Sequence, residues 1–192
     1  MLDRLGEGDV LVMAGSVPKS VPDTIYAQIM KRLSGRGVLC IVDTSGSPFL
    51  HVLEEKPFLI KPSLRELEEI FHCPMKEGVL LSSMIALAQR GVRNVLVSCG
   101  EHGAYLLDEH GGFYYGKSPA GRVINTAGAG DAMVAGFLKG WLQTSDYALA
   151  FKRGIAAGSA SAFSRGMADA EAVKKLYAKV HIEVMREPVM EG

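Results

Sequence analysis

The sequence has no excess of charge, no long apolar run and few cysteines. Its 21 Lys and Arg residues balance 21 Asp and Glu residues in a chain of 192, which argues against nucleic acid or an anionic membrane as the main partner. It has no run of about 18 apolar residues that could cross a membrane. The first ten residues, MLDRLGEGDV, lack the basic and then apolar order of a signal peptide. We therefore expect a cytoplasmic protein with no membrane or nucleic-acid partner.

The cysteines and histidines do not favour a disulfide or metal framework. The three cysteines are odd in number, far apart and outside any CxxC spacing, which is typical of reduced intracellular thiols. The five histidines show no spacing that would bring two of them to one metal, which favours surface roles. These residues are Cys40, Cys73, Cys99, His51, His72, His102, His110 and His181.

The chain alternates between strand and helix patterns. Short apolar runs that end in turns predict strands at 9–15, 37–46 and 58–63, and three more between 94 and 116. Stretches with a helical period lie at 23–33, 63–71 and 77–90, with two or three helices within 129–180. This order predicts an α/β fold, a mostly parallel sheet with helices on both faces. We expect one domain over residues 1–192, with a loose tail at 183–192.

Two of the predicted helices have capping residues at their starts. Asp23 follows Pro22 and is expected to cap the helix at 23–33. Ser63 and Glu66 have the spacing of a capping box at the start of the helix at 63–71.

Glycine-containing or polar turns follow the predicted strands, where ligands bind in open α/β sheets. In NTAGAGDAMVAGF (125–137), three small residues, Gly128 to Gly130, precede Asp131 and an apolar helix. Amides exposed at a helix N-terminus favour an anion. The carboxylate of Asp131 either caps this helix or faces a substrate hydroxyl and takes its proton while the amides hold a phosphoryl group. The other turns are AGSVP (14–18), KPSLRE (61–66) and SCGEHG (98–103).

These motifs resemble those of the ribokinase-like carbohydrate kinases. NTAGAGDAMVAGFL resembles the C-terminal signature of that family, KPSLREL its K-P-N-x-x-E-L segment, and VSCGEHGAYL its S-x-G-x-x-G-A nucleotide loop. LVMAGSVP resembles the S-G-S-x-P segment of its sugar-phosphate kinases. The four motifs occur in the order of the family, from about Gly8 to about Val180. The stretches DTSG, FLIKPS and MVAGF together look most like the 1-phosphofructokinase branch, with the tagatose-6-phosphate kinases next.

The resemblance implies a Rossmann-like three-layer fold of the ribokinase-like type and an enzyme that uses ATP and Mg²⁺. The implied reaction is phosphoryl transfer to a phosphorylated ketohexose, in the first place fructose 1-phosphate to fructose 1,6-bisphosphate. Asp131 would be the general base, and the amides of Gly128, Ala129 and Gly130 would form an anion hole. The implied partners are the sugar phosphate and ATP. A sheet edge left by missing strands would also invite a homodimer.

Further residues receive a role only through the resemblance. Lys61 and Ser63 would lie near the phosphates, Glu66 would place Mg²⁺ through water, and Ser16 would contact the phosphate of the sugar. The nucleotide loop would contribute Ser98, Gly100, Glu101, His102 and Gly103.

Each of these roles has a structural alternative. Glu66 could serve the capping box alone, Lys61 could be a solvated strand end, and Ser16 could be a turn hydroxyl. The glycines of 98–103 could belong to a plain hairpin turn.

The chain departs from the family pattern in two ways. Ser63 stands where the family has asparagine, so an amide donor is lost near the expected metal. The resemblance also begins partway through the family pattern, so we expect a truncated form without the first strands, a sugar-holding glycine pair and a β lid. Three hypotheses stay open: part of a kinase, a nucleotide-binding module without turnover, and a degenerate chain that needs a partner over an exposed sheet edge.

Overall fold

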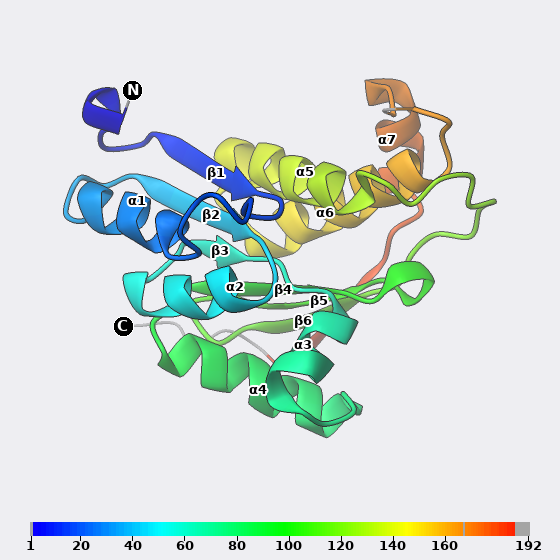
Figure 1. The fold of residues 1–192 in the computed structure, drawn as a ribbon. Coiled ribbons are helices and arrows are strands. Elements are labelled where there is room, and N and C mark those ends of the chain that lie inside the picture. Colours follow the sequence, from blue (N-terminus) through cyan, green and yellow to red (C-terminus); the bar gives the residue numbers. More distant parts are fainter. Residues whose placement is uncertain (1, 167, 187–192) are drawn as a thin grey trace. The chain divides into compact units, whose positions relative to one another are not determined.

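A computed structural model describes residues 2–166 and 168–186 (Figure 1). The chain forms two compact units, Met1–Leu96 and Val97–Gly192. Each unit has its own strands and helices. The expectation of one domain stays a prediction.

Parallel strands form the core of the first unit. They are β1 (Val10–Ala14), β2 (Leu39–Asp43), β3 (Leu59–Ile60) and the start of β4 (Asn94–Ser98). Each pairs with the next in parallel, for example Val12 with Ile41, Val42 with Ile60, and Ile60 with Val95. Ile41, Val42, Leu59, Ile60 and Val95 are fully buried, as expected for parallel strands covered on both faces. The strands predicted at 9–15, 37–46 and 58–63 are confirmed.

The helices of the first unit are α1 (Ile25–Leu33), α2 (Ser47–Val52), α3 (Leu64–Phe71) and α4 (Glu77–Gln89), with short 3₁₀ turns at Leu2–Arg4 and Leu53–Glu55. Three of these helices, α1, α3 and α4, agree with the predicted positions, and α2 was not predicted. The prediction for Asp23 was wrong, because α1 has Thr24 at its N-cap and no side-chain cap bond there. Asp23 instead accepts a hydrogen bond from the hydroxyl of Ser47 at 2.5 Å, a partner that lies 24 positions along the chain.

The second unit contains antiparallel strands. β5 (Ala104–Leu107) pairs with β6 (Phe113–Gly116), and β6 pairs with β7 (Ile182–Arg186). The buried Asp108 closes the β5–β6 turn by accepting from the amides of His110 and Gly112 and from the hydroxyl of Tyr114.

Residues 183–186 belong to β7, where the sequence predicted a loose tail. Residues 187–192 lie outside the described residues.

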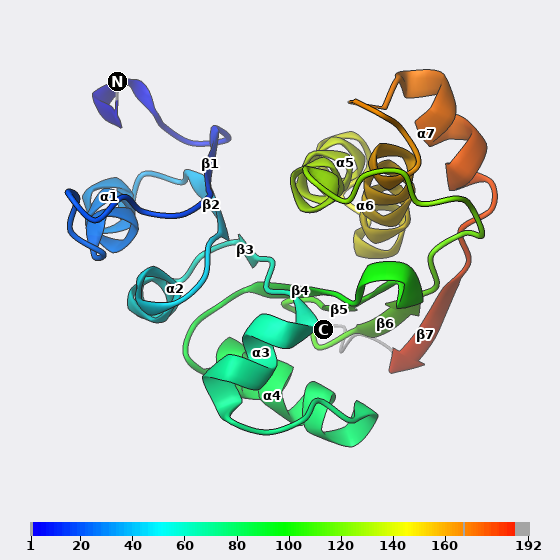
Figure 2. The same ribbon diagram turned by 45° about the vertical axis from the view of Figure 1, so that its right-hand side comes forward.

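Two long helices of the second unit pack closely against each other. α5 (Ala129–Thr144) and α6 (Tyr147–Ala162) lie side by side, and α7 (Ala170–Tyr177) follows α6 (Figures 1 and 2). Glycines make the close approach possible. A Cβ atom on Gly136 would lie 2.6 Å from the Cβ of Ala157, and one on Gly140 would lie 2.6 Å from the Cα of Ala150. Among the described residues, no helix is long and apolar enough to cross a membrane.

Candidate functional site

The turn after β1 is bonded to the end of β2. Gly15 has a φ of 93°, which suits glycine because side chains crowd the backbone in that region. Its amide donates to the carbonyl of Asp43 at 2.9 Å, and its carbonyl accepts from the hydroxyl of Thr44 at 2.9 Å. Ser16, the predicted contact for the sugar phosphate, follows this turn and is exposed.

Lys61 is buried and paired, and is not a solvated strand end. Its side chain is 7% exposed, and its Nζ lies 3.2 Å from Oδ1 of Asp43, which is 18% exposed. Both residues stand at the carboxyl ends of neighbouring parallel strands. No role was predicted for Asp43 from the sequence. An acidic residue that ends an apolar strand, in LCIVD, is the signal that could have found it.

Ser63 and Glu66 form the predicted capping box at the start of α3. Oε2 of Glu66 accepts from the amide of Ser63 at 2.6 Å and from its hydroxyl at 2.8 Å. The amide of Glu66 donates to the Ser63 hydroxyl at 3.2 Å. The structural alternative for Glu66 is therefore present, and it holds the carboxylate in one orientation.

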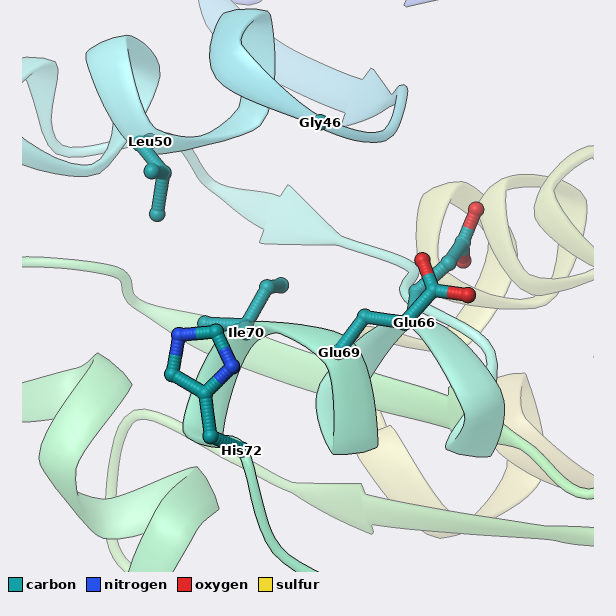
Figure 3. Close-up of a pocket in the computed structure, with 6 residues that line it drawn as sticks. All are labelled: Gly46, Leu50, Glu66, Glu69, Ile70 and His72. Atoms are coloured by element: carbon teal, nitrogen blue, oxygen red, sulfur yellow. The ribbon is translucent and has the colours of Figure 1, made fainter.

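Glu66 also lines a cavity of about 200 Å³ between α2 and α3 (Figure 3). Leu50 and Ile70 supply apolar side chains, and Glu69 and His72 lie on the α3 side. Within the described residues, no group of three or more Asp, Glu, His or Cys side chains could hold a metal ion. Glu66 therefore fits only a metal that takes most of its ligands from water or from phosphate oxygens, as Mg²⁺ commonly does.

The loop at 98–103 is a tight turn in the second unit. Ser98 ends β4, and residues Gly100–His102 form a 3₁₀ turn. The amide of Cys99 donates to the carbonyl of Gly103 at 2.8 Å. A Cβ atom on Gly103 would lie 2.0 Å from the carbonyl oxygen of Gly116. Packing against β6 is therefore a sufficient reason for glycine at position 103. Gly100, with a φ of 59°, faces open space instead.

The side chains of this loop differ in exposure. Glu101 and His102 are exposed, and the carbonyl of His102 accepts from the hydroxyl of Tyr115 at 2.8 Å. Burial raises the pKa of the Cys99 thiol to about 11. At neutral pH Cys99 is therefore a protonated thiol within the loop, and not a nucleophile.

Asp131 lies in the first turn of α5 and does not cap that helix. The N-cap is Gly128, with a φ of 75° and no side-chain cap bond. Asp131 is exposed, and its carboxylate makes no hydrogen bond or ion pair with any residue that the structure describes. The capping alternative for Asp131 is thus not what this structure shows.

The turn before α5 is held by its own backbone and by the end of α6. The amide of Ala129 donates to the carbonyl of Thr126 at 3.1 Å, and the amide of Ala127 donates to Oδ1 of Asn125 at 3.0 Å. The amides of Ile124 and Asn125 both donate to the carbonyl of Ala162.

The amides of Gly130 and Asp131 lie in the first turn of α5, where a helix offers its amides no internal acceptor. These two amides and the dipole of a 16-residue helix can stabilise an anion.

The structure thus groups the predicted residues in two places. Ser16, Lys61, Ser63 and Glu66 belong to the first unit, and Lys61 and the turn before Ser16 meet through Asp43 and Thr44. The loop 98–103 and the turn 128–131 belong to the second unit.

The model of the pfkB family carbohydrate kinases matches residues 1–173. The chain belongs to this family. It is 36% identical over 181 residues to a 1-phosphofructokinase of Bacillus subtilis, covering 93% of this chain and 59% of that protein. It is 32% identical over 191 residues to a D-tagatose-1-phosphate kinase of Bacillus licheniformis, with the same coverage of 93% and 59%.

Solved structures agree with the fold class. The chain superposes with a TM-score of 0.85 on phosphofructokinase-2 from Escherichia coli in complex with substrates and products, at 26% identity. The match covers 93% of this chain and 59% of that chain. The predicted ribokinase-like α/β fold with a mostly parallel sheet is therefore confirmed. The chain spans about 59% of the length of the relatives that it matches.

Proposed function

We propose that this chain takes part in phosphoryl transfer from ATP to a phosphorylated ketohexose, with fructose 1-phosphate as the acceptor. Membership of the pfkB family supports a sugar kinase. The observation that carries the reaction itself is Asp131, an exposed carboxylate in the first turn of α5 that is not used as a cap. The name of the Bacillus subtilis relative supports fructose 1-phosphate as the sugar.

In the proposed step, Asp131 acts as general base. Its carboxylate takes the proton of a sugar hydroxyl while that oxygen forms a bond to the γ-phosphorus of ATP. The bond from the γ-phosphorus to the bridging oxygen breaks, and ADP leaves. The turn at 128–130 and the first amides of α5 stabilise the charge on the phosphoryl oxygens. The Ala129 amide would contribute only after leaving the carbonyl of Thr126.

Each motif group contains residues with a proposed role toward the nucleotide or the metal. Lys61 carries a cation at the end of β3, and the carboxylate of Glu66 is oriented by Ser63. Glu66 would hold Mg²⁺ through water, and the metal would supply positive charge to neutralise the phosphates. Ser98, Gly100, Glu101, His102 and Gly103 would lie along the nucleotide, with only Gly103 fully explained by packing. Ser16 would bind the phosphate that the sugar already carries.

A second acceptor has support from one relative. The D-tagatose-1-phosphate kinase of Bacillus licheniformis is 32% identical to this chain, so a phosphorylated tagatose is a candidate as well. A nucleotide-binding module without turnover is another candidate, because the chain spans about 59% of the length of its relatives.

The remaining hypothesis is a degenerate chain that needs a partner, and such a chain would bind no nucleotide alone. The predictions of a homodimer and of a cytoplasmic protein stay proposals.

A coupled assay for ADP release tests the proposal. In a context where the activity is present, we expect release that depends on Mg²⁺ and on a sugar phosphate, with fructose 1-phosphate preferred over tagatose 1-phosphate and tagatose 6-phosphate. Nucleotide titration by calorimetry, run beside the assay, separates a binding module from a degenerate chain. ADP release without any dependence on a sugar phosphate would contradict the assignment. Light scattering of the same sample reports the oligomeric state.

A further inference from the structure

The end of β2 connects two predicted binding elements. Oδ1 of Asp43 is 3.2 Å from Nζ of Lys61, and the backbone of Asp43 accepts from the amide of Gly15 at 2.9 Å. The hydroxyl of the next residue, Thr44, donates to the carbonyl of Gly15 at 2.9 Å. Asp43 and Thr44, here called the β2 hub, thus touch Lys61 on one side and the turn that leads to Ser16 on the other.

Burial makes the contact between Asp43 and Lys61 consequential. Lys61 is 7% exposed, and a buried ammonium without a nearby anion is costly. The long lysine side chain also has many rotamers, and an ion pair at its end selects among them. Asp43 therefore determines where the ammonium of Lys61 lies at the end of β3.

Thr44 has the corresponding effect on the neighbouring turn. It is 7% exposed, so its hydroxyl is shielded from water and its bond to Gly15 is not readily exchanged for a hydration bond. The hydroxyl of Tyr26 also donates to the carbonyl of Ala14 at 3.2 Å. The carbonyls of Ala14 and Gly15 are thereby fixed from two sides, immediately before Ser16.

We propose that Asp43 and Thr44 are positioning residues, Asp43 for the nucleotide phosphates through Lys61 and Thr44 for the acceptor phosphate through the Gly15–Ser16 turn. This inference rests on the proposed function. It predicts a division of effects between two adjacent residues. Loss of the Asp43 carboxylate weakens nucleotide binding, and loss of the Thr44 hydroxyl weakens sugar-phosphate binding.

Calorimetric titration of the 192-residue chain with Mg²⁺–ATP and with fructose 1-phosphate tests this division. Asp43→Asn should raise the Kd for Mg²⁺–ATP roughly ten-fold, and Thr44→Val should raise the Kd for fructose 1-phosphate roughly three- to ten-fold. Asp43→Asn should change the Kd for fructose 1-phosphate by less than about two-fold, and Thr44→Val should change the Kd for Mg²⁺–ATP by less than about two-fold. The control is Asp3→Asn, which removes an exposed ion pair with Arg32 and should leave both values unchanged. Equal effects of both variants on both ligands would overturn the proposal.

A double-mutant cycle separates positioning from a general loss of structure. If Asp43 acts through Lys61, Asp43→Asn should have almost no further effect on the Kd for Mg²⁺–ATP in a Lys61→Met background. An undiminished effect in that background would show that Asp43 does not act through Lys61. If Asp43→Asn does not fold, Asp43→Glu takes its place, because it keeps the charge and displaces it by one methylene.

Acylation of lysines, mapped by mass spectrometry, tests the hub without any ligand. Lys61 should react slowly in the wild type and roughly ten times faster in Asp43→Asn, while the exposed Lys56 reacts equally in both. A rate for Lys61 that does not change would overturn its positioning by Asp43. If the wild type binds no nucleotide, the proposed function fails, and the acylation rates still decide whether Asp43 holds Lys61.

Discussion

The carboxylate of Asp131 makes no hydrogen bond or ion pair with any of the described residues. A positioned general base contributes roughly 10² to 10⁴ in rate, so Asp131→Asn should lower turnover by that factor wherever ADP release is measured. The Kd for nucleotide should change little, because the base acts on the sugar hydroxyl. Steady-state kinetics and titration of the same preparation check both parts. Undiminished turnover in the variant would refute the assignment.

Ser63 allows a test of the departure from the family pattern. Ser63→Asn should lower the Mg²⁺ concentration needed for half-maximal nucleotide binding, because the amide adds a donor next to Glu66. Asparagine is also a good N-cap residue, so α3 should keep its start. Ser63→Ala is the matched control. It should cost about 1 kcal/mol of stability, measured by urea unfolding. If the magnesium dependence is the same in Ser63→Asn and wild type, then either Ser63 already serves the metal as well as asparagine would, or position 63 has only a capping role.

Cys99 allows a test of burial within the loop at 98–103. Because burial raises the pKa of its thiol to about 11, the folded state holds the proton more tightly than the unfolded state, whose thiols titrate near 8.5. Its contribution to stability is therefore complete below about pH 8.5 and declines as pH rises toward 11. Alkylation of Cys99 by iodoacetamide near pH 8.5 should be roughly 100-fold slower in the folded chain than in urea. Peptide mapping measures the rate, and equal rates in both states would contradict the burial.

Within the secondary-structure elements, the packing of α5 on α6 depends on glycine. At Gly136 a Cβ atom would lie 2.6 Å from the Cβ of Ala157 and 2.7 Å from the carbonyl oxygen of Arg153. Gly136→Ala should therefore destabilise the chain by about 1–3 kcal/mol, since close-packed helices cannot absorb an added methyl. The measurement is the midpoint of urea unfolding. A shift of less than about 0.5 kcal/mol would show that the helices can separate slightly.

Gly78 in α4 provides the matched control for this change. No atom lies within 4 Å of a Cβ built there, and alanine is the better helix former by up to about 1 kcal/mol. Gly78→Ala should therefore leave stability unchanged or raise it. The same substitution then has opposite effects on two helices, according to what each glycine touches.

For the whole molecule, we predict a difference between nucleotide binding and turnover. Holding donor and acceptor together contributes up to about 7–11 kcal/mol of the barrier, and the chain spans about 59% of its relatives. We expect the purified 192-residue chain to bind ATP or ADP weakly with Mg²⁺ and to phosphorylate fructose 1-phosphate negligibly. Sugar-dependent ADP release, measured beside nucleotide binding, checks this. Robust turnover would show that the 192 residues position both substrates unaided.

Much of the architecture and the family could be inferred from the sequence because these signals are local. Apolar runs predicted β1 to β6, and the Ser63–Glu66 spacing predicted a capping box that the structure contains. The GAGD turn predicted the start of α5, with the carboxylate of Asp131 at the junction. Strand runs, capping boxes and glycine turns are each defined within a few residues, so neighbours in the sequence suffice to find them.

The structural features that could not be predicted from the sequence depend on residues far apart in the chain. Lys61 is buried because Asp43, on the neighbouring strand, is within reach of its ammonium. Residues 182–186 become a strand because β6 offers them an edge to pair with, and their own pattern does not predict this. Asp23 does not cap α1, and its carboxylate accepts a hydrogen bond from Ser47 instead. Such partners are chosen by packing and register, because a buried charge or an open backbone edge takes whichever partner the fold brings close.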